Sequence, residues 1–176
     1  MFKLEKINLN SLNEIDSGIK VFKNLFFKDQ RGLLSVNYEG EILNKSNYIS
    51  IKESYSNPMT GRGLHFQKKP FGQDKIISLG SGSILDFVYN TESKYREIYY
   101  FPIDSSMNIS IYLPSKFAHG FIALEETIFR YLCIGKYNEQ NEITYNLLPN
   151  ISRLLKLGEI FLSKKDSSFP DLDISF

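Results

Sequence analysis

The two histidines of the chain lie in two short phrases whose residue types could transfer protons. His65 lies in the phrase Arg62–Gln67, and His119 lies in the apolar phrase Phe117–Phe121. An imidazole takes up and returns a proton near neutral pH, so each histidine is a candidate acid or base. The alternative is that both are hydrogen-bonded core residues, since histidine is also found inside aromatic-rich interiors.

Two cationic residues near His65 favour a site over the core alternative. Arg62 lies three residues before His65 and Lys75 lies ten residues after it. A guanidinium suits phosphate oxygens, and an ammonium can stabilise an enolate oxygen. On an ideal strand, residues three apart point to opposite faces. Arg62 and His65 therefore need a bulge, or a contact from a neighbouring subunit, to meet one ligand.

A metal site is not expected from these histidines. Metal centres in small barrels take three or four ligands, often with two histidines close together. Here His65 is followed by Phe66 and Gln67, and the chain has no third histidine. A site of two histidines and one carboxylate is the alternative to acid–base chemistry.

Composition restricts the class of protein. The 176 residues predict one domain, 1–176, and 21 basic against 20 acidic residues indicate no nucleic-acid partner. The single cysteine, Cys133, excludes an intrachain disulfide and is expected to be a buried apolar residue, which favours a cytoplasmic location. No apolar run approaches the roughly 20 residues of a membrane span.

The elements that must position these residues are short extended segments separated by Gly, Pro, Asn and Ser. This pattern is typical of an all-β sandwich or barrel. We expect 117–124 and 127–134 to form a hairpin around Glu125 and Glu126, and a short helix over about 151–158. The other expected strands are 18–27, 33–38, 47–55, 62–67, 75–79, 83–90, 97–101 and 107–113.

Taken in order, the phrases resemble dTDP-4-dehydrorhamnose 3,5-epimerases from about residue 20 to 166. The similarity lies in Asp29–Gly32, Arg62–Gln67, Gln73–Lys75 and Phe117–Phe121. It implies a cupin-like jelly-roll barrel without metal or cofactor, with one or two short helices mainly near the C-terminus. It also implies a homodimer that epimerises a dTDP- or GDP-linked 4-keto-6-deoxy sugar at C3, C5 or both.

The same resemblance implies roles for individual residues. His65 is similar to the family's base, Tyr131 to the acid on the opposite face, and Lys75 to the lysine that stabilises the O4 enolate. Inversion needs such a second acid, because one base cannot remove and restore a proton on opposite faces. Asp166 resembles the aspartate that orients the histidine, with Asp86 as the alternative. The residues expected to bind substrate are Arg31 and Arg62, at the diphosphate, and Gln67 and His119.

The sequence departs from the family around the substrate. Leu33–Val36 lack the family's acid, and Lys52, Glu53 and Ser54 replace an Asn-His-Ser phrase. The nucleobase, the choice of hexose or 6-deoxyheptose, and the centre inverted therefore stay open. Two alternatives are a 3,4-ketoisomerase, which normally carries a second histidine near the first, and a non-catalytic sugar-nucleotide-binding cupin. The latter predicts that His65 and Tyr131 point away from a common cavity.

Overall fold

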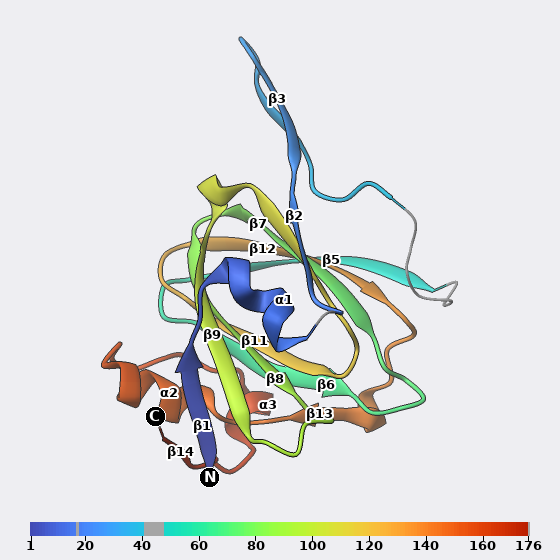
Figure 1. The fold of residues 1–176 in the computed structure, drawn as a ribbon. Coiled ribbons are helices and arrows are strands. Elements are labelled where there is room, and N and C mark those ends of the chain that lie inside the picture. Colours follow the sequence, from blue (N-terminus) through green and yellow to red (C-terminus); the bar gives the residue numbers. More distant parts are fainter. Residues whose placement is uncertain (17, 41–47, 176) are drawn as a thin grey trace.

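Two β-sheets face each other and enclose an aromatic core (Figure 1). The structure, a computed structural model, describes residues 1–16, 18–40 and 48–175. The strands are β1 (Phe2–Lys6), β2 (Lys20–Lys23), β3 (Leu25–Asp29), β4 (Gly32–Val36), β5 (Ile49–Ser56), β6 (Gly61–Gln67), β7 (Asp74–Ser81), β8 (Ser83–Asn90), β9 (Glu97–Asp104), β10 (Ile109–Leu113), β11 (Phe117–Ala123), β12 (Thr127–Ile134), β13 (Glu142–Thr144) and β14 (Ile174–Ser175). The helices are α1 (Leu12–Ile15), α2 (Leu148–Leu155) and α3 (Lys164–Ser167), with 3-10 turns η1 (Leu9–Ser11), η2 (Ser105–Met107) and η3 (Glu139–Asn141).

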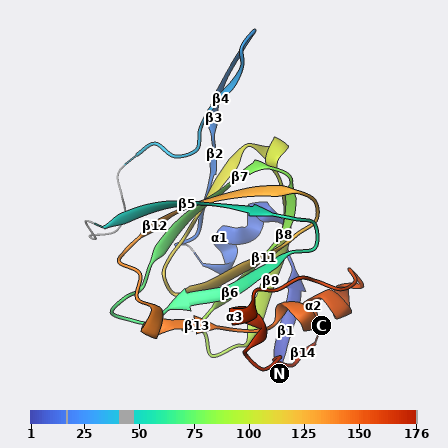
Figure 2. The ribbon, with the colours of Figure 1, turned by 180° about the vertical axis from the view of Figure 1, so that it is seen from behind.

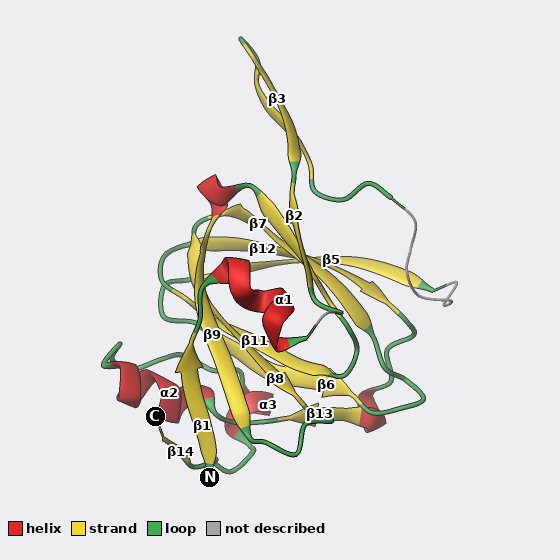
Figure 3. Cartoon of the chain, viewed as in Figure 1, coloured by secondary structure: helices red, strands yellow, loops and turns green. Residues whose placement is uncertain are grey.

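The strand order gives the barrel its two walls. One sheet has seven strands in the order β13-β6-β11-β8-β9-β1-β14, and the other has five in the order β2-β10-β7-β12-β5. Phe87, Phe101 and Phe117 are among the largest side chains buried completely between and beside these sheets. Figure 3 shows that strands dominate and helices are short. The prediction of an all-β, cupin-like jelly roll is confirmed.

The predicted hairpin of 117–124 and 127–134 is wrong. β11 pairs with β6 and β8 in the seven-stranded sheet, whereas β12 pairs with β5 and β7 in the five-stranded sheet. The turn at Leu124–Glu126 thus carries the chain from one wall to the other. Both strands are apolar and adjacent in sequence, and neither property distinguishes a hairpin from a crossing between sheets.

The limits of the other elements agree only in part with those predicted from the sequence. The predicted helix exists but begins earlier, at Leu148, and ends at Leu155, because Pro149 suits the first turn and Lys156 adopts a left-handed conformation (φ 56°). The expected strand 18–27 is divided at Asn24 into β2 and β3. β1 was not predicted, although it alternates buried Phe2 and Leu4 with outward-facing residues. Residue 47 of the expected strand 47–55 lies outside the described residues.

One hairpin stands apart from the barrel. Within the described part of the chain, β3 and β4 pair only with each other, and they project away from both sheets in two opposite views (Figures 1 and 2). The hairpin exposes five large apolar side chains, each at least 58% exposed. They are Leu25, Phe26, Phe27, Leu33 and Leu34.

No helix among the described residues is long and apolar enough to span a membrane.

Candidate active site

A bulge in β6 directs Arg62 and His65 toward the same cavity. His119 on β11 is opposite His65, and Phe121 is opposite Arg62, so two residues of β6 face one residue of β11. This extra residue changes the alternation of side chains along the strand. Of the two arrangements expected from the sequence, the structure has the bulge, and both side chains line the cavity.

Two glycines permit this bulge. Gly63 has φ of +106°, and a Cβ there would lie 2.6 Å from the main-chain oxygen of His119. A Cβ at Gly120 would lie 2.5 Å from the main-chain oxygen of Arg62. Only glycine allows the two strands to approach this closely. The glycines of the two histidine phrases therefore set the positions of the histidines.

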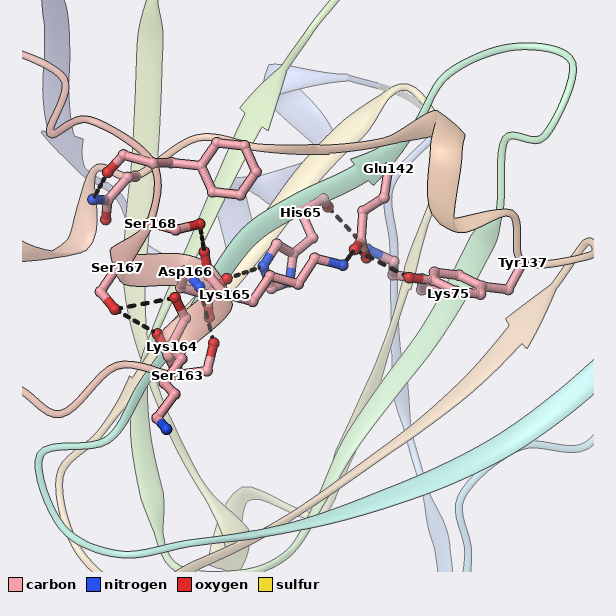
Figure 4. Close-up of polar contacts among 12 residues, drawn as sticks. His65, Lys75, Tyr137, Glu142, Ser163, Lys164, Lys165, Asp166, Ser167 and Ser168 are labelled. Atoms are coloured by element: carbon pink, nitrogen blue, oxygen red, sulfur yellow. Dashed lines mark hydrogen bonds and ion pairs between the residues drawn. The ribbon is translucent and has the colours of Figure 1, made fainter.

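His65 is paired with an aspartate from the C-terminal region. The His65 imidazole Nε2 lies 2.6 Å from Asp166 Oδ1, and Figure 4 shows the carboxylate pointing at the ring. Asp166 is on α3, where the Ser163 hydroxyl accepts the hydrogen bond of the Asp166 N–H as an N-cap. The His65 side chain is 30% exposed and that of Asp166 only 5%, so the imidazole reaches the cavity and the carboxylate lies behind it.

Asp166 keeps its charge although it is buried. Burial acts to raise the pKa of Asp166, but the hydrogen bond and charge of His65, the Ser163 cap and the charge of Lys165 together hold it below the usual carboxyl range. A charged carboxylate fixes the proton on the imidazole nitrogen that faces it. The other ring nitrogen is left with the lone pair that a base needs.

His119 has its own aspartate and is more enclosed. Its Nε2 lies 2.9 Å from both oxygens of Asp86, and the two side chains are 7% and 0% exposed. Burial raises the pKa of Asp86, opposed by His119 and by the charge of Lys75. The imidazole also stacks on Phe129, at 5.8 Å between ring centroids. Of the two aspartates considered for His65, Asp166 makes the hydrogen bond and Asp86 binds His119.

The facing sheet supplies an ammonium and a phenol. Lys75 on β7 donates a hydrogen bond to the main-chain oxygen of His65, at 3.2 Å, and burial lowers its pKa. Tyr131 lies on the neighbouring strand, β12, opposite Ile77 of β7. Burial raises the pKa of Tyr131, so the phenol holds its proton. Lys75 is thus a half-buried residue of a central strand and not a lysine in a solvated turn.

One cavity of about 560 Å³ joins these groups. Its walls include His65, Lys75, His119, Tyr131 and Asp166. His65 and His119 come from the seven-stranded sheet, whereas Lys75 and Tyr131 come from the five-stranded sheet. A planar substrate held between the walls would meet the imidazole on one side and the phenol on the other. His65 and Tyr131 share this cavity, contrary to the expectation for a non-catalytic binder.

Sequence reasoning missed several polar residues of the cavity wall, among them Tyr137, Glu142, Lys165 and Lys52. Tyr137 and Lys165 both bond to Glu142, the phenol donating to Oε2 at 3.1 Å (Figure 4). Lys52, on β5, lies beside Tyr131 and Tyr137. The available signal for Lys52 was the polar alternation of Ser50, Lys52 and Ser54 along a strand. No local pattern brings Glu142 to Lys165.

Two predicted binding residues lie outside the cavity. The buried Gln67 accepts the N–H of Asn138 at 2.9 Å, next to Tyr137, and so holds the loop of a cavity residue. Arg31 is at the tip of the β3–β4 hairpin, where it pairs with Asp29 at 2.6 Å. Within the described ranges, no group of three or more His, Cys, Asp and Glu side chains could hold a metal ion.

Comparison with known proteins agrees with this geometry. The family model described as dTDP-4-dehydrorhamnose 3,5-epimerase matches residues 14–173. An enzyme of that name from Sinorhizobium fredii is 25% identical over 181 residues, covering 97% of this chain and 92% of the relative. The crystal structure of the dTDP-4-dehydrorhamnose 3,5-epimerase from Bacillus anthracis, with TDP and PPi bound, has a TM-score of 0.74 at 26% identity, covering 88% of this chain and 94% of that chain.

A further solved structure supports the fold alone. A double mutant of a 3′-monoepimerase from Streptomyces bikiniensis, in complex with dTDP, has a TM-score of 0.75 at 21% identity, covering 88% of this chain and 83% of that chain. The match of the family model over nearly the whole length is the stronger finding. The chain belongs to the dTDP-4-dehydrorhamnose 3,5-epimerase family.

Proposed function

We propose that this protein epimerises a dTDP-linked 4-keto-6-deoxy sugar at C3, C5 or both. One observation carries the proposal: an imidazole–carboxylate pair and a phenol line one cavity from opposite sheets. The 4-keto group acidifies the hydrogens on its neighbouring carbons, so a weak base can remove one of them. The choice of dTDP is supported by the related epimerase from Bacillus anthracis, which was solved with TDP and PPi bound.

The proposed reaction has two proton transfers. His65 takes the proton from carbon, and the electron pair of that C–H bond moves to O4 as an enolate, which the Lys75 ammonium stabilises. Tyr131 then gives its phenolic proton to the other face of the same carbon, and the electron pair returns from O4 to form the new C–H bond. Solvent takes the proton from His65 and restores that of Tyr131, so nothing is consumed.

The diphosphate fits the cationic rim of the cavity. Arg62 donates to the Ser56 hydroxyl at 3.0 Å and to the Tyr55 carbonyl at 3.2 Å, which orients its guanidinium without neutralising it. A planar guanidinium binds phosphate oxygens in pairs. We assign Arg62 to the diphosphate and His119 to the sugar side of the cavity, where Asp86 holds the ring.

We place the reaction in the cytoplasm, since the free Cys133 is buried and unpaired with another cysteine.

We further propose a homodimer in which the β3–β4 hairpin reaches a second copy. The hairpin exposes Phe26, Phe27 and Leu34 to solvent, which is costly for a protein that stays monomeric. β5 is an edge strand, and its outward Ile51 and Tyr55 are 79% and 70% exposed. A hairpin seated beside β5 would cover both surfaces and bring Arg31 toward the cavity of the partner.

Product analysis tests the reaction against its alternatives. Incubation with dTDP- and GDP-linked 4-keto-6-deoxyglucose, followed by proton NMR of the product, should show inverted coupling patterns at C3 or C5 with the dTDP sugar. A carbonyl moved to C3 would indicate a ketoisomerase. Tight binding without any chemical change would indicate a binding protein, and either result would overturn the proposal.

A further inference from the structure

We propose that Lys52 is a positioning residue for Tyr131, stabilising the phenolate that remains when Tyr131 gives its proton to the substrate. This inference rests on the proposed epimerase function. It gives a role to a cavity residue to which the proposed reaction assigns none. Lys52 occurs where the sequence departs from the related phrases, so it would be a feature of this chain in particular.

The register of the five-stranded sheet places the two side chains together. Lys52 on β5 is directly opposite Tyr131 on β12, and both line the cavity. Opposed residues of an antiparallel pair project to the same face of the sheet. The Lys52 ammonium lies 5.7 Å from the centre of the Tyr131 ring and 5.3 Å from that of Tyr137. Both distances are within the range of cation–π attraction.

The charge of Lys52 is available for this task. Its sequence neighbour Glu53 points to the outer face and pairs with Arg130 at 2.5 Å, and Lys165 across the cavity pairs with Glu142. Among the residues that the structure describes, no carboxylate lies within ion-pair distance of the Lys52 ammonium. An uncompensated cation beside an aromatic ring interacts more strongly with the phenolate, whose negative charge is spread over that ring, than with the phenol.

Tyr131 needs such a cation because other features of its surroundings oppose its ionisation. Burial is the largest influence raising its pKa, and Cys133 on its own strand and Glu142 on β13 act in the same direction. Arg62 on β6 acts against them. Lys75 faces Cys133 from β7, two residue pairs along the sheet from Tyr131, and the Tyr137 ring centre lies 5.3 Å from the Lys52 ammonium. Lys52 is the cation directly across from the ring.

The step itself is balanced. As the O–H bond of Tyr131 breaks, the proton forms the new C–H bond, and the electron pair of the O–H bond stays on the phenolate. The phenolate is neutralised when solvent returns a proton. Lys52 exchanges no proton in this scheme, so its contribution is electrostatic and should survive replacement by another cation.

The experiment compares Lys52→Met, which removes the charge but keeps much of the stem, with Lys52→Arg, which keeps the charge. Inversion and solvent exchange at carbon are followed separately in D2O over a range of pH, with Lys68→Met as an exposed control. We expect Lys52→Met to lower the rate of inversion by about 3- to 30-fold. Exchange, which depends on His65, should stay near that of the unmodified enzyme. Lys52→Arg should restore most of the inversion.

A second measurement needs no substrate. Labelling with difluorotyrosine brings the phenols into a pH range that the fold tolerates, and fluorine NMR of the eleven tyrosines, assigned with Tyr131→Phe, reports their ionisation. Lys52→Met should move the titration of Tyr131 to higher pH, and Lys52→Arg should not. An unmoved titration, or a rise in KM alone with unchanged inversion, would overturn the inference. If the unmodified protein neither exchanges nor inverts, the epimerase function fails, while the titration still tests the Lys52–Tyr131 pair.

Discussion

The imidazole of His65 and the carboxylate of Asp166 lie 2.6 Å apart although the two residues are 101 positions apart in the chain. α3 carries Asp166 to the cavity, and the Ser163 cap fixes the first turn of that helix. In the proposed reaction the carboxylate orients the ring and balances the charge of the imidazolium, so we infer that the pair acts as the unit that removes a proton. The C-terminal region is therefore part of the site.

Asp166→Asn should lower the rate of solvent exchange at carbon by about 10- to 100-fold, because an amide neither fixes the same tautomer nor balances the imidazolium. The measurement is deuterium incorporation by NMR. Asp173→Asn, an exposed residue a few positions away, is the matched control and should retain exchange. Equal losses in both variants would contradict a specific role of Asp166.

The same pair predicts a pH dependence of stability. Because the folded-state pKa of Asp166 is lowered, its stabilising contribution is present above the ordinary carboxyl pKa of about 3.9 and is lost as the pH falls through the folded value. Denaturant unfolding should show Asp166→Asn less stable than the unmodified protein at pH 7. That difference should shrink as the pH falls below about 4. A difference that is constant with pH would indicate a packing effect.

Tyr131→Phe should separate the two proton transfers. Without the phenol, His65 can still exchange the proton on its own face, but the opposite face has no donor. We expect exchange to remain within a few fold and inversion to fall by about 100-fold or more. Tyr95→Phe, in an exposed loop, serves as the control. Retained inversion in Tyr131→Phe would require another acid on the five-stranded sheet.

Lys75→Met should make the protein more stable and less active. Burial lowers the pKa of Lys75, so the folded state carries a cost for its charge at neutral pH. Its removal should raise the free energy of unfolding by on the order of 1 kcal/mol and reduce exchange by about 100-fold. The gain should be largest near neutral pH and diminish as the pH approaches about 10.4, where the unfolded lysine also loses its charge. Lys69→Met, at an exposed loop residue, should show no comparable gain in stability.

The exposed apolar side chains of the β3–β4 hairpin predict a dimer, and a single charge introduced among them should disrupt it. Phe27 is 61% exposed in the single chain, and Phe27→Asp should raise the dissociation constant by about 100-fold in analytical ultracentrifugation. Gln30→Asp adds the same charge at the polar tip and should leave the dimer intact. A chain that is monomeric before any substitution would contradict the proposed assembly.

Mixed dimers test whether Arg31 acts on the partner. If it does, combining His65→Ala chains with Arg31→Met chains creates one complete site in each mixed dimer. Activity should then exceed that of either variant alone, with a lowered KM. If Arg31 acts within its own chain, or not at all, mixing will restore nothing.

Much of the fold follows from the sequence because its strands show alternation and clear turns. β6, β8 and β12 begin and end close to their predicted limits, and the bulge at Gly63 was one of two stated possibilities. The crossing between β11 and β12 was missed, because pairing partners depend on contacts far along the chain. β1 was missed although its alternation of Phe2 and Leu4 was visible.

The site was predictable where residues share a phrase and less so where the fold assembles them. His65 and His119 were identified from their phrases. The structure pairs His65 with Asp166, as the resemblance implied, and pairs His119 with Asp86, which had been considered only for His65. The pattern Ser163-x-x-Asp166 is a helix-capping signal that could have located α3. Arg31 was expected at the diphosphate, but the structure places it at the tip of an exposed hairpin, where only the proposed dimer would give it a role in binding.

The most direct test is deuterium exchange at C3 and C5 of dTDP-4-keto-6-deoxyglucose in D2O, followed by NMR for the unmodified protein and for His65→Ala. The unmodified protein should incorporate deuterium and yield inverted product, and His65→Ala should do neither while keeping its fold by circular dichroism. Absence of exchange with the unmodified protein, or full exchange in His65→Ala, would contradict the central claim that His65 removes a proton from a 4-keto sugar.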